Sequence, residues 1–226
     1  MLSQGEVVLK ARITWSSNAT FLAEVRDGQS ELAAIYKPER GERRLWDFPP
    51  GLWRREVAAY ELDRFLGWGL VPPTAARQDG PLGPGSLQLC VDAAPGEHYF
   101  TLVKQPRWWP QLRKVAAFDL VANNADRKSG HCLLGQDGKI WAIDNGLCFH
   151  SAPKLRTVIW DFAGEPLGPE LVTDLQPLAQ GAVPEALACL LDSAEARALA
   201  RRAARALDEG AFPEPTGDFP LPWPLI

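Results

Sequence analysis

Two aspartates stand at positions in this sequence where a carboxylate could do chemistry. Asp126 lies in the polar stretch 123–130, directly after an apolar run, and Asp144 follows the apolar residues 141–143. A carboxylate at the end of a strand, beside a turn that contains glycine, is suited to hold a magnesium ion against phosphate oxygens. Two such carboxylates on loops that flank a hairpin can share one magnesium-bound nucleotide. The alternative is that neither aspartate is functional, and that Asp126 is a turn residue and Asp144 an ordinary residue at the end of a strand.

A lysine and a glutamate precede this pair in the chain. Phosphoryl transfer needs a cation that grips the phosphates, carboxylates that hold magnesium, and a carboxylate that orients the acceptor and takes its proton. Lys37 ends a strand-like run, which is the setting of a phosphate-binding kinase lysine. Glu56 opens the next helical segment, where an ion pair could position Lys37, and Glu61 on the same helix competes for that role. The residue types and their order predict phosphoryl transfer.

Hydrophobic periodicity and turn residues predict the elements that must position these side chains. We expect strands over 7–13, 21–26 and 32–36, a helix over 54–66, a strand pair on either side of 78–80 that ends with 86–91, a helix over 112–121, strands over 132–134 and 140–143, and a helix over 194–207. Asp192 and Glu195 have the spacing of a helix start, and Gly210 ends that helix. The tail from Phe212 is rich in proline and is not expected to be helical.

This order of elements predicts an α+β protein with two lobes around a cleft. We expect a strand-rich N-terminal lobe over residues 1–92 and a mainly helical C-terminal lobe over 93–226, with a Pro-rich tail over 211–226. The cleft should lie near residues 88–95. The long polar and aromatic connection over 38–53 is expected to be a loop, and long loops are often functional.

The composition argues against some classes of binding partner. The 226 residues carry a net charge of −4 and a pI of about 5.5, which argues against general attraction to nucleic acid or to an anionic membrane. No apolar run reaches the roughly 20 residues that a membrane helix needs, so stable membrane insertion is not expected. The four cysteines form no CxxC pair, and without an export signal we expect buried thiols and a cytoplasmic protein.

Several short motifs resemble one known group of kinases. The stretches 124–127 (Asn-Ala-Asp-Arg) and 142–147 (Ala-Ile-Asp-Asn-Gly-Leu) resemble the catalytic loop and metal-binding motif of type II phosphatidylinositol 4-kinases and of the wider phosphatidylinositol 3/4-kinase and HipA-like group. Further matches follow the same order at 35–38, 55–60, 71–74 and 85–89. The chain as a whole resembles a bacterial family with a phosphatidylinositol 3/4-kinase-like domain, over roughly residues 5–165.

The resemblance implies a bilobal atypical protein-kinase-like fold that uses ATP with Mg²⁺ or Mn²⁺. It implies that Lys37 contacts the α- and β-phosphates, that Glu56 orients Lys37, that Asp126 is the base that orients the acceptor, and that Asp144 binds the metal. It places Arg127 in the catalytic set beside Asp126. The segment Ser16–Thr20 would cover the phosphates, and Gln88–Val91 would form the hinge that holds adenine. The ATP-binding residues implied in these two segments are Ser16, Ser17, Asn18, Gln88, Leu89, Cys90 and Val91.

One position departs from the kinase pattern. The pattern places an asparagine five residues after the catalytic aspartate as a second metal ligand, and this chain has His131 there. Imidazole suits softer metals than magnesium. Three interpretations follow: His131 binds a metal such as manganese, it contacts phosphate as a cation, or the protein is a weak kinase or a nucleotide-binding pseudokinase.

The lipid acceptor of the resembling kinases does not carry over well. The chain lacks a cysteine-rich palmitoylation segment, and Trp108-Trp109 is the only candidate patch that could contact a membrane surface. Paired aromatic residues of this kind more often lie in the hydrophobic core. We therefore predict an ATP-dependent phosphotransferase that acts on a protein or small-molecule hydroxyl. The alternatives are a nucleotide-binding pseudokinase or regulatory scaffold without turnover, and transfer of AMP instead of phosphate.

Overall fold

The N-terminal part of the protein is an antiparallel sheet with one long helix beside it. The computed structural model describes residues 1–14, 16, 18–215 and 219–226. The five-stranded sheet has the order β1-β2-β3-β5-β4. Its strands are β1 (Glu6–Ile13), β2 (Thr20–Asp27), β3 (Ser30–Pro38), β4 (Thr74–Arg77) and β5 (Gly85–Leu89). Helix α1 (Leu52–Leu66) follows β3 after a short 3-10 helix, Glu39–Gly41, and a loop, and it ends at Gly67, which has a left-handed conformation.

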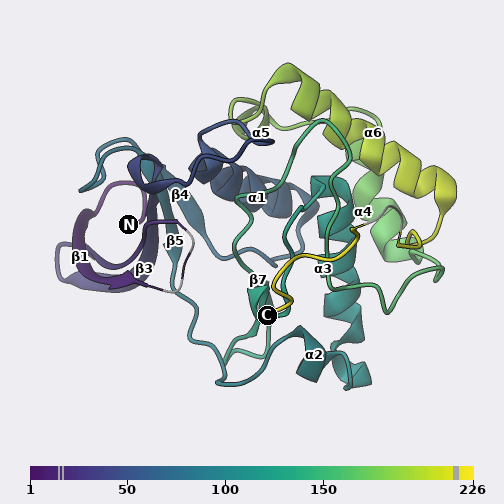
Figure 1. The fold of residues 1–226 in the computed structure, drawn as a ribbon, viewed down its shortest axis with the longest axis horizontal. Coiled ribbons are helices and arrows are strands. Elements are labelled where there is room, and N and C mark those ends of the chain that lie inside the picture. The colour runs from purple at the N-terminus through teal and green to yellow at the C-terminus, as the bar shows by residue number, and fades with distance from the viewer. Residues whose placement is uncertain (15, 17, 216–218) are drawn as a thin grey trace.

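The C-terminal part is mainly helical. Its α-helices are α2 (Tyr99–Leu102), α3 (Trp109–Ala122), α4 (Pro169–Ala179), α5 (Glu185–Ala188) and α6 (Ser193–Glu209), and its 3-10 helices are Pro106–Trp108 and Ser129–His131. A two-stranded hairpin, β6 (Cys132–Leu134) with β7 (Ile140–Ala142), lies beside these helices. Figure 1 shows the curled sheet on one side and the helices on the other, with α1 between them.

Alternation along β3 decides which face of the sheet Lys37 occupies. Ala34, Tyr36 and Pro38 are buried, whereas Ile35 and Lys37 are partly exposed. Ala34 and Tyr36 pack with residues of β2 and β5 inside the curled sheet. Because successive side chains of a strand point to opposite faces, Lys37 leaves this small core and faces α1.

A second, larger core joins α1 to the helical part. It contains Ala58 and Leu62 of α1 together with Phe118 of α3 and Leu199 of α6. At the start of α6, Asp192 accepts hydrogen bonds from the N–H groups of residues 194 and 195, which confirms the predicted helix start. Arg55 of α1 forms a buried ion pair with Glu195, so the first turn of α6 is tied to α1.

The Pro-rich tail packs against the loops of the helical part. The backbone N–H of Ser129 donates to the carbonyl oxygen of Leu225 at 2.8 Å, and that of Thr157 donates to Pro220 at 3.1 Å. In Figure 1 the last segment of the chain crosses the helical part and ends near β7. The tail is therefore a strap over the segment that contains Asp126.

The predicted elements agree closely with the observed ones. Each predicted strand and helix is present, and the mixed α+β fold with an N-terminal antiparallel sheet and C-terminal helices is confirmed. All four cysteines are free thiols, but only Cys132 and Cys148 are fully buried, while Cys90 is half-buried and Cys189 is exposed. No helix in the described part of the chain is long and apolar enough to cross a membrane.

Candidate active site

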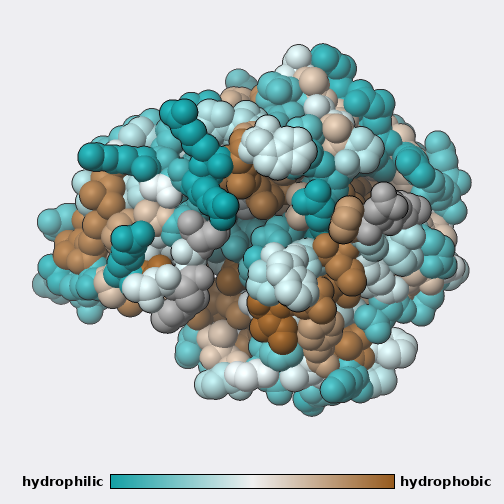
Figure 2. Space-filling view, viewed as in Figure 1, coloured by the Kyte–Doolittle hydropathy of each residue, from teal (hydrophilic) through white to brown (hydrophobic). Residues whose placement is uncertain are grey.

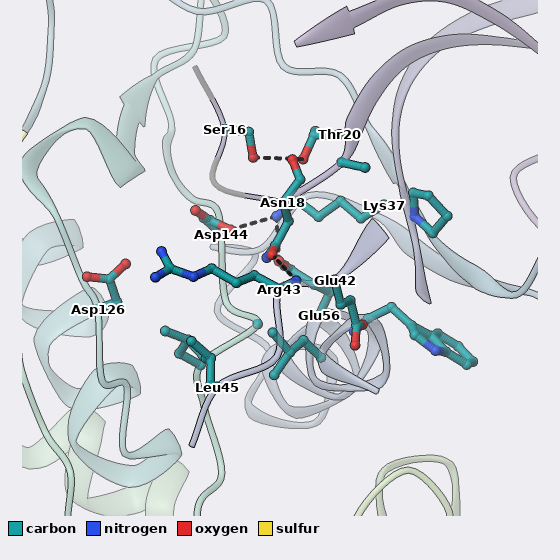
Figure 3. Close-up of a pocket in the computed structure, with 16 residues that line it drawn as sticks. Ser16, Asn18, Thr20, Lys37, Glu42, Arg43, Leu45, Glu56, Asp126 and Asp144 are labelled. Atoms are coloured by element: carbon teal, nitrogen blue, oxygen red, sulfur yellow. Dashed lines mark hydrogen bonds and ion pairs between the residues drawn. The ribbon is translucent and has the colours of Figure 1, made fainter. Parts of the chain in front are cut away.

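Lys37 is the centre of the candidate site. Its ammonium group forms an ion pair with Glu56 of α1 and a second one with Asp144 Oδ1, at 2.7 Å. Burial disfavours the charged lysine, but the two carboxylates outweigh burial and raise the pKa of Lys37. The predicted pairing of Lys37 with Glu56 is therefore present, and it extends to the aspartate after β7. Figure 3 shows these side chains together at one side of a cavity.

Glu56 connects the lysine to the loop that follows β7. It is buried, and its Oε2 accepts the backbone N–H of Asn145 at 3.0 Å. Burial raises the pKa of Glu56, against the lowering effect of Lys37. The competing candidate, Glu61, instead pairs with Arg64 on the surface of α1 at 3.0 Å. The structure thus selects Glu56 as the partner of Lys37.

Asp144 projects from a tight turn toward the cavity. Its φ of 58° lies in the left-handed region, which aspartate tolerates better than most residues. The ammonium group of Lys37 lowers the pKa of Asp144 and keeps the carboxylate charged. Gly146 allows α1 to approach this turn, because a Cβ at that position would lie 3.3 Å from Glu56 Oε1. About half of the Asp144 side chain is exposed, so it can still take a ligand.

Asp126 lies across the cavity from this group. The helix before it ends at Asn123 in a left-handed conformation, and the side chain of Asn124 accepts the backbone N–H of Asp126 at 2.9 Å. The carboxylate contacts Lys128 Nζ at 3.0 Å. Burial raises the pKa of Asp126, and Lys128 only partly offsets that effect. A carboxylate with a raised pKa is better suited to accept a proton than a free surface aspartate.

Arg127 has a different place from the one that the resemblance implies. It is fully buried and lies outside the cavity lining. Its guanidinium group pairs with Asp119 of α3 at 2.9 Å and donates to Asn145 Oδ1 and to the carbonyl oxygen of Ile143, both at 2.7 Å. Arg127 therefore positions the loops of Asp126 and Asp144 relative to α3 and does not reach a substrate in the cavity.

His131 faces Asp144 as a neutral ring. Its Nε2 lies 3.4 Å from Asp144 Oδ2, and its Nδ1 accepts the backbone N–H of Lys128 at 3.4 Å. Burial lowers the pKa of His131 to about 4. With Nδ1 accepting, the ring proton lies on Nε2 and points at Asp144. This arrangement argues against His131 as a cation for phosphate and favours a role in orienting Asp144.

Several described residues just before and at the start of β2 line another side of the cavity. Ser16, Asn18 and Thr20 all line it, and the hydroxyls of Ser16 and Thr20 are 2.9 Å apart. Ser17, the remaining predicted phosphate-loop residue, lies outside the described residues. Asn18 Oδ1 accepts the backbone N–H of Arg43 at 2.8 Å, so this loop is joined to the segment after β3.

Arg43 is a site residue that we did not predict from the sequence. It lines the cavity, and Figure 3 shows its side chain extended with the guanidinium group directed toward the region between Asp126 and Asp144. A guanidinium group there can contact phosphate oxygens in two places at once. The cluster of charged residues over 39–44 was the available signal for a site residue, but the direction in which each side chain points could not be read from the sequence.

The predicted adenine hinge is not part of the cavity lining. The N–H of Leu89 donates to Pro73 O at 2.8 Å, and the N–H of Cys90 donates to Ala33 O at 3.0 Å. The Gln88 side chain donates to Thr74 Oγ1 at 2.8 Å. These donors serve the sheet and its edges, and the hinge role of Gln88–Val91 stays a prediction.

The carboxylates fit magnesium that arrives with a nucleotide. Within the described residues, no group of three or more His, Cys, Asp and Glu side chains could hold a metal ion by itself. Magnesium is usually bound through one or two carboxylates together with substrate phosphates and water. Asp144, charged and half-exposed, supplies such a carboxylate.

Sequence comparison assigns the chain to a family. Over 263 aligned residues it is 41% identical to protein Rv2133c of Mycobacterium tuberculosis, with 100% of this chain and 94% of the relative covered. This chain belongs to the Rv2133c family. This Rv2133c family member is also 36% identical over 139 residues to phosphatidylinositol 4-kinase gamma 4 of rice, a match that covers 51% of this chain and 24% of that protein. No protein-family model matches the sequence.

Structure comparison shows that this Rv2133c family member shares the atypical-kinase-like fold of hydra Fam20. The structure of hydra Fam20 with sugar superposes with a TM-score of 0.58 at 15% identity, over 92% of this chain and 85% of that one. The Helicobacter pylori proinflammatory kinase CtkA aligns with a TM-score of 0.48 at 9% identity, over 93% of this chain and 94% of that one. Shewanella oneidensis HipA aligns with a TM-score of 0.49 at 14% identity, over 88% of this chain and 65% of that one.

Proposed function

We propose that this protein is an ATP-dependent phosphotransferase that acts on the hydroxyl group of a protein or a small molecule. One observation carries the proposal: Lys37 is held by both Glu56 and Asp144 at a cavity that Asp126 also lines. These residues come from β3, α1 and two separate loops, so their convergence is a property of the fold. The kinase-like fold supports the same conclusion.

Each of these side chains has a separate task in the proposed reaction. Lys37 binds the α- and β-phosphates, and Glu56 keeps Lys37 in place. Asp144 would hold magnesium, which when bound neutralises charge on the phosphate oxygens. Asp126 orients the acceptor hydroxyl and takes its proton. The acceptor oxygen forms a bond to the γ-phosphorus while the bond to the β–γ bridging oxygen breaks, and ADP leaves.

The direct test uses labelled ATP with magnesium or manganese. We expect label on the protein itself or on an added hydroxyl compound. Asp126→Ala and Asp144→Ala should both abolish the label, because one removes the base and the other the metal ligand. Asp137→Ala is the matched control, since Asp137 is an exposed aspartate in the β6–β7 turn. Equal labelling by all three variants would refute the proposal.

A non-catalytic nucleotide-binding role is the second candidate. It is favoured by His131, which stands where the kinase pattern has a metal-binding asparagine and whose Nδ1 is already occupied. This role predicts a thermal shift with ATP but no turnover. ATP consumption that Asp144→Ala abolishes would exclude it. Mass spectrometry of the labelled product separates added phosphate from added AMP.

The rice relative supplies a lipid alternative for the acceptor. Because that match covers only about a quarter of the rice protein, the kinase's lipid substrate is only a hypothesis for this chain. Phosphatidylinositol vesicles therefore belong in the assay as a separate acceptor. Labelled lipid in the organic phase would replace a protein or small-molecule acceptor with a lipid one and leave the phosphotransferase assignment intact.

A further inference from the structure

The segment between β3 and α1 concentrates positive charge next to the candidate site. We define the arginine segment as residues 39–54, which contain the four exposed arginines Arg40, Arg43, Arg44 and Arg54. Among the described residues, none of these four forms an ion pair. The whole chain carries a net charge of −4, so this surface differs in sign from the average of the molecule.

The acidic residues of the same segment are used to fix its shape. Glu42 accepts the N–H groups of Gly51 and Trp53 at 2.9 and 2.7 Å, and so caps the start of α1. Glu39 accepts the indole N–H of Trp53 at 3.1 Å, and Asp47 pairs with Lys154 at 2.8 Å. The negative groups are therefore engaged in holding the segment, while the guanidinium groups remain available at its surface.

A groove along the arginine segment leads into the catalytic cavity. The groove has a volume of about 530 Å³, against about 110 Å³ for the catalytic cavity. The two share Glu42, Arg43, Leu45 and Leu52 in their linings. Trp46 in the same segment is 95% exposed and can contact an apolar side chain of a ligand. In Figure 2, hydrophilic side chains gather over the region of this segment.

We propose that the arginine segment docks the acceptor, and that this acceptor is a polypeptide with acidic residues close to the hydroxyl that receives the phosphoryl group. The proposal rests on the phosphotransferase function above. The arginines extend from the 3-10 helix after β3 to the first turn of α1, which is a wider span than one small anion can contact. The groove and an exposed tryptophan beside it suit an extended chain, and its continuity with the cavity delivers the hydroxyl toward Asp126.

The experiment measures peptide binding directly, without ATP. A fluorescent serine-containing peptide flanked by Asp and Glu is compared with the same peptide flanked by Asn and Gln, using anisotropy and the full chain. We expect the acidic peptide to bind about tenfold more tightly at low salt, and this preference to fall as salt rises. R40E/R44E should weaken the acidic peptide by on the order of tenfold or more, because two favourable contacts become repulsive.

The matched control makes the same change in net charge elsewhere. R12E/R201E replaces two exposed arginines, one on β1 and one on α6, and should leave peptide binding unchanged. Circular dichroism and melting temperature check that both double variants are folded, and R40Q/R44Q gives an intermediate loss without introducing repulsion. Equal affinity for the two peptides, or an equal loss in R12E/R201E, would overturn the proposal.

Two further outcomes separate this inference from the proposed function. If inorganic phosphate binds at the arginine segment and the acidic peptide does not, the surface takes a small anion and the docking proposal fails. If the acidic peptide binds as expected but ATP is not consumed, docking stands and the phosphotransferase function fails. Labelling of the acidic peptide in preference to the neutral one, lost in R40E/R44E while ATP binding remains, supports both.

Discussion

The buried pair of Arg127 with Asp119 gives a quantitative test of how the loops of Asp126 and Asp144 are held. Both side chains are fully buried. In Arg127→Met, Asp119 loses its cation and keeps only hydrogen bonds from Asn124 and Thr157. Removing one partner of a buried ion pair costs about 3–5 kcal/mol, because the other charge is left uncompensated. The acceptors on Ile143 and Asn145 also lose their donor, which adds to the cost.

Urea unfolding, followed by tryptophan fluorescence, measures this loss. With a slope of about 2–3 kcal/mol per molar urea for a chain of this size, the midpoint should fall by about 1–2.5 M. The control is Arg205→Ala, which breaks the exposed pair of Arg205 with Glu209 on α6 and should cost about 0.3–0.5 kcal/mol. The apolar double variant D119L/R127M should be more stable than R127M alone.

The functional readout separates positioning from contact with substrate. Since Arg127 holds the loops of Asp126 and Asp144, loss of activity in a conservative Arg127→Lys variant should appear in kcat more than in the KM for ATP. A loss of stability below about 1 kcal/mol in Arg127→Met would contradict the buried-pair argument. So would an activity loss confined to KM, because that would indicate direct contact with the nucleotide.

Three more perturbations test other parts of the site. Glu56→Gln keeps an acceptor for the N–H of Asn145 but removes the negative charge beside Lys37. It should reduce kcat/KM for ATP by about 10- to 150-fold, which corresponds to the free energy of one hydrogen bond to a charged group. An unchanged kcat/KM would contradict the idea that Glu56 positions Lys37. His131→Asn places an amide oxygen beside Asp144 and should raise the rate with magnesium relative to manganese, whereas a lower ratio would show that the imidazole is needed. Removal of residues 216–226 takes away the acceptors for Ser129 and Thr157, and should lower kcat with a stability loss of about 1–3 kcal/mol in urea unfolding; unaltered kcat would show that the tail is dispensable.

Most of the fold and the centre of the candidate site could be predicted from local sequence patterns. The alternation in β3 and the helical period of α1 are encoded over a few residues, so Lys37 and Glu56 could be placed on facing elements from the sequence. Asp144 followed from its place between a strand and a glycine turn. These predictions depend only on which way a side chain leaves its own element.

The parts that the sequence did not predict depend on contacts between distant residues. Arg127 follows Asp126 directly, yet its side chain enters the core because Asp119 on α3 neutralises it there. Arg43 reaches the cavity because its loop is held by Glu42 at α1 and by Asp47 at Lys154. The hydrogen bonds of the predicted hinge could not be read from the sequence, because the partners of the N–H groups of residues 89 and 90 lie elsewhere in the N-terminal part, at Pro73 and Ala33.

The strap formed by the tail has a consequence for the order in which the protein is made. Lys37 and Glu56 emerge early from the ribosome, and Asp126 and Asp144 follow. The loop that contains Asp126 obtains its last backbone partner only when Leu225 is free to fold back on Ser129. A chain truncated before the tail would therefore display the cavity with the loop of Asp126 unsupported, because that loop gains its Leu225 partner only after residue 225 has been added.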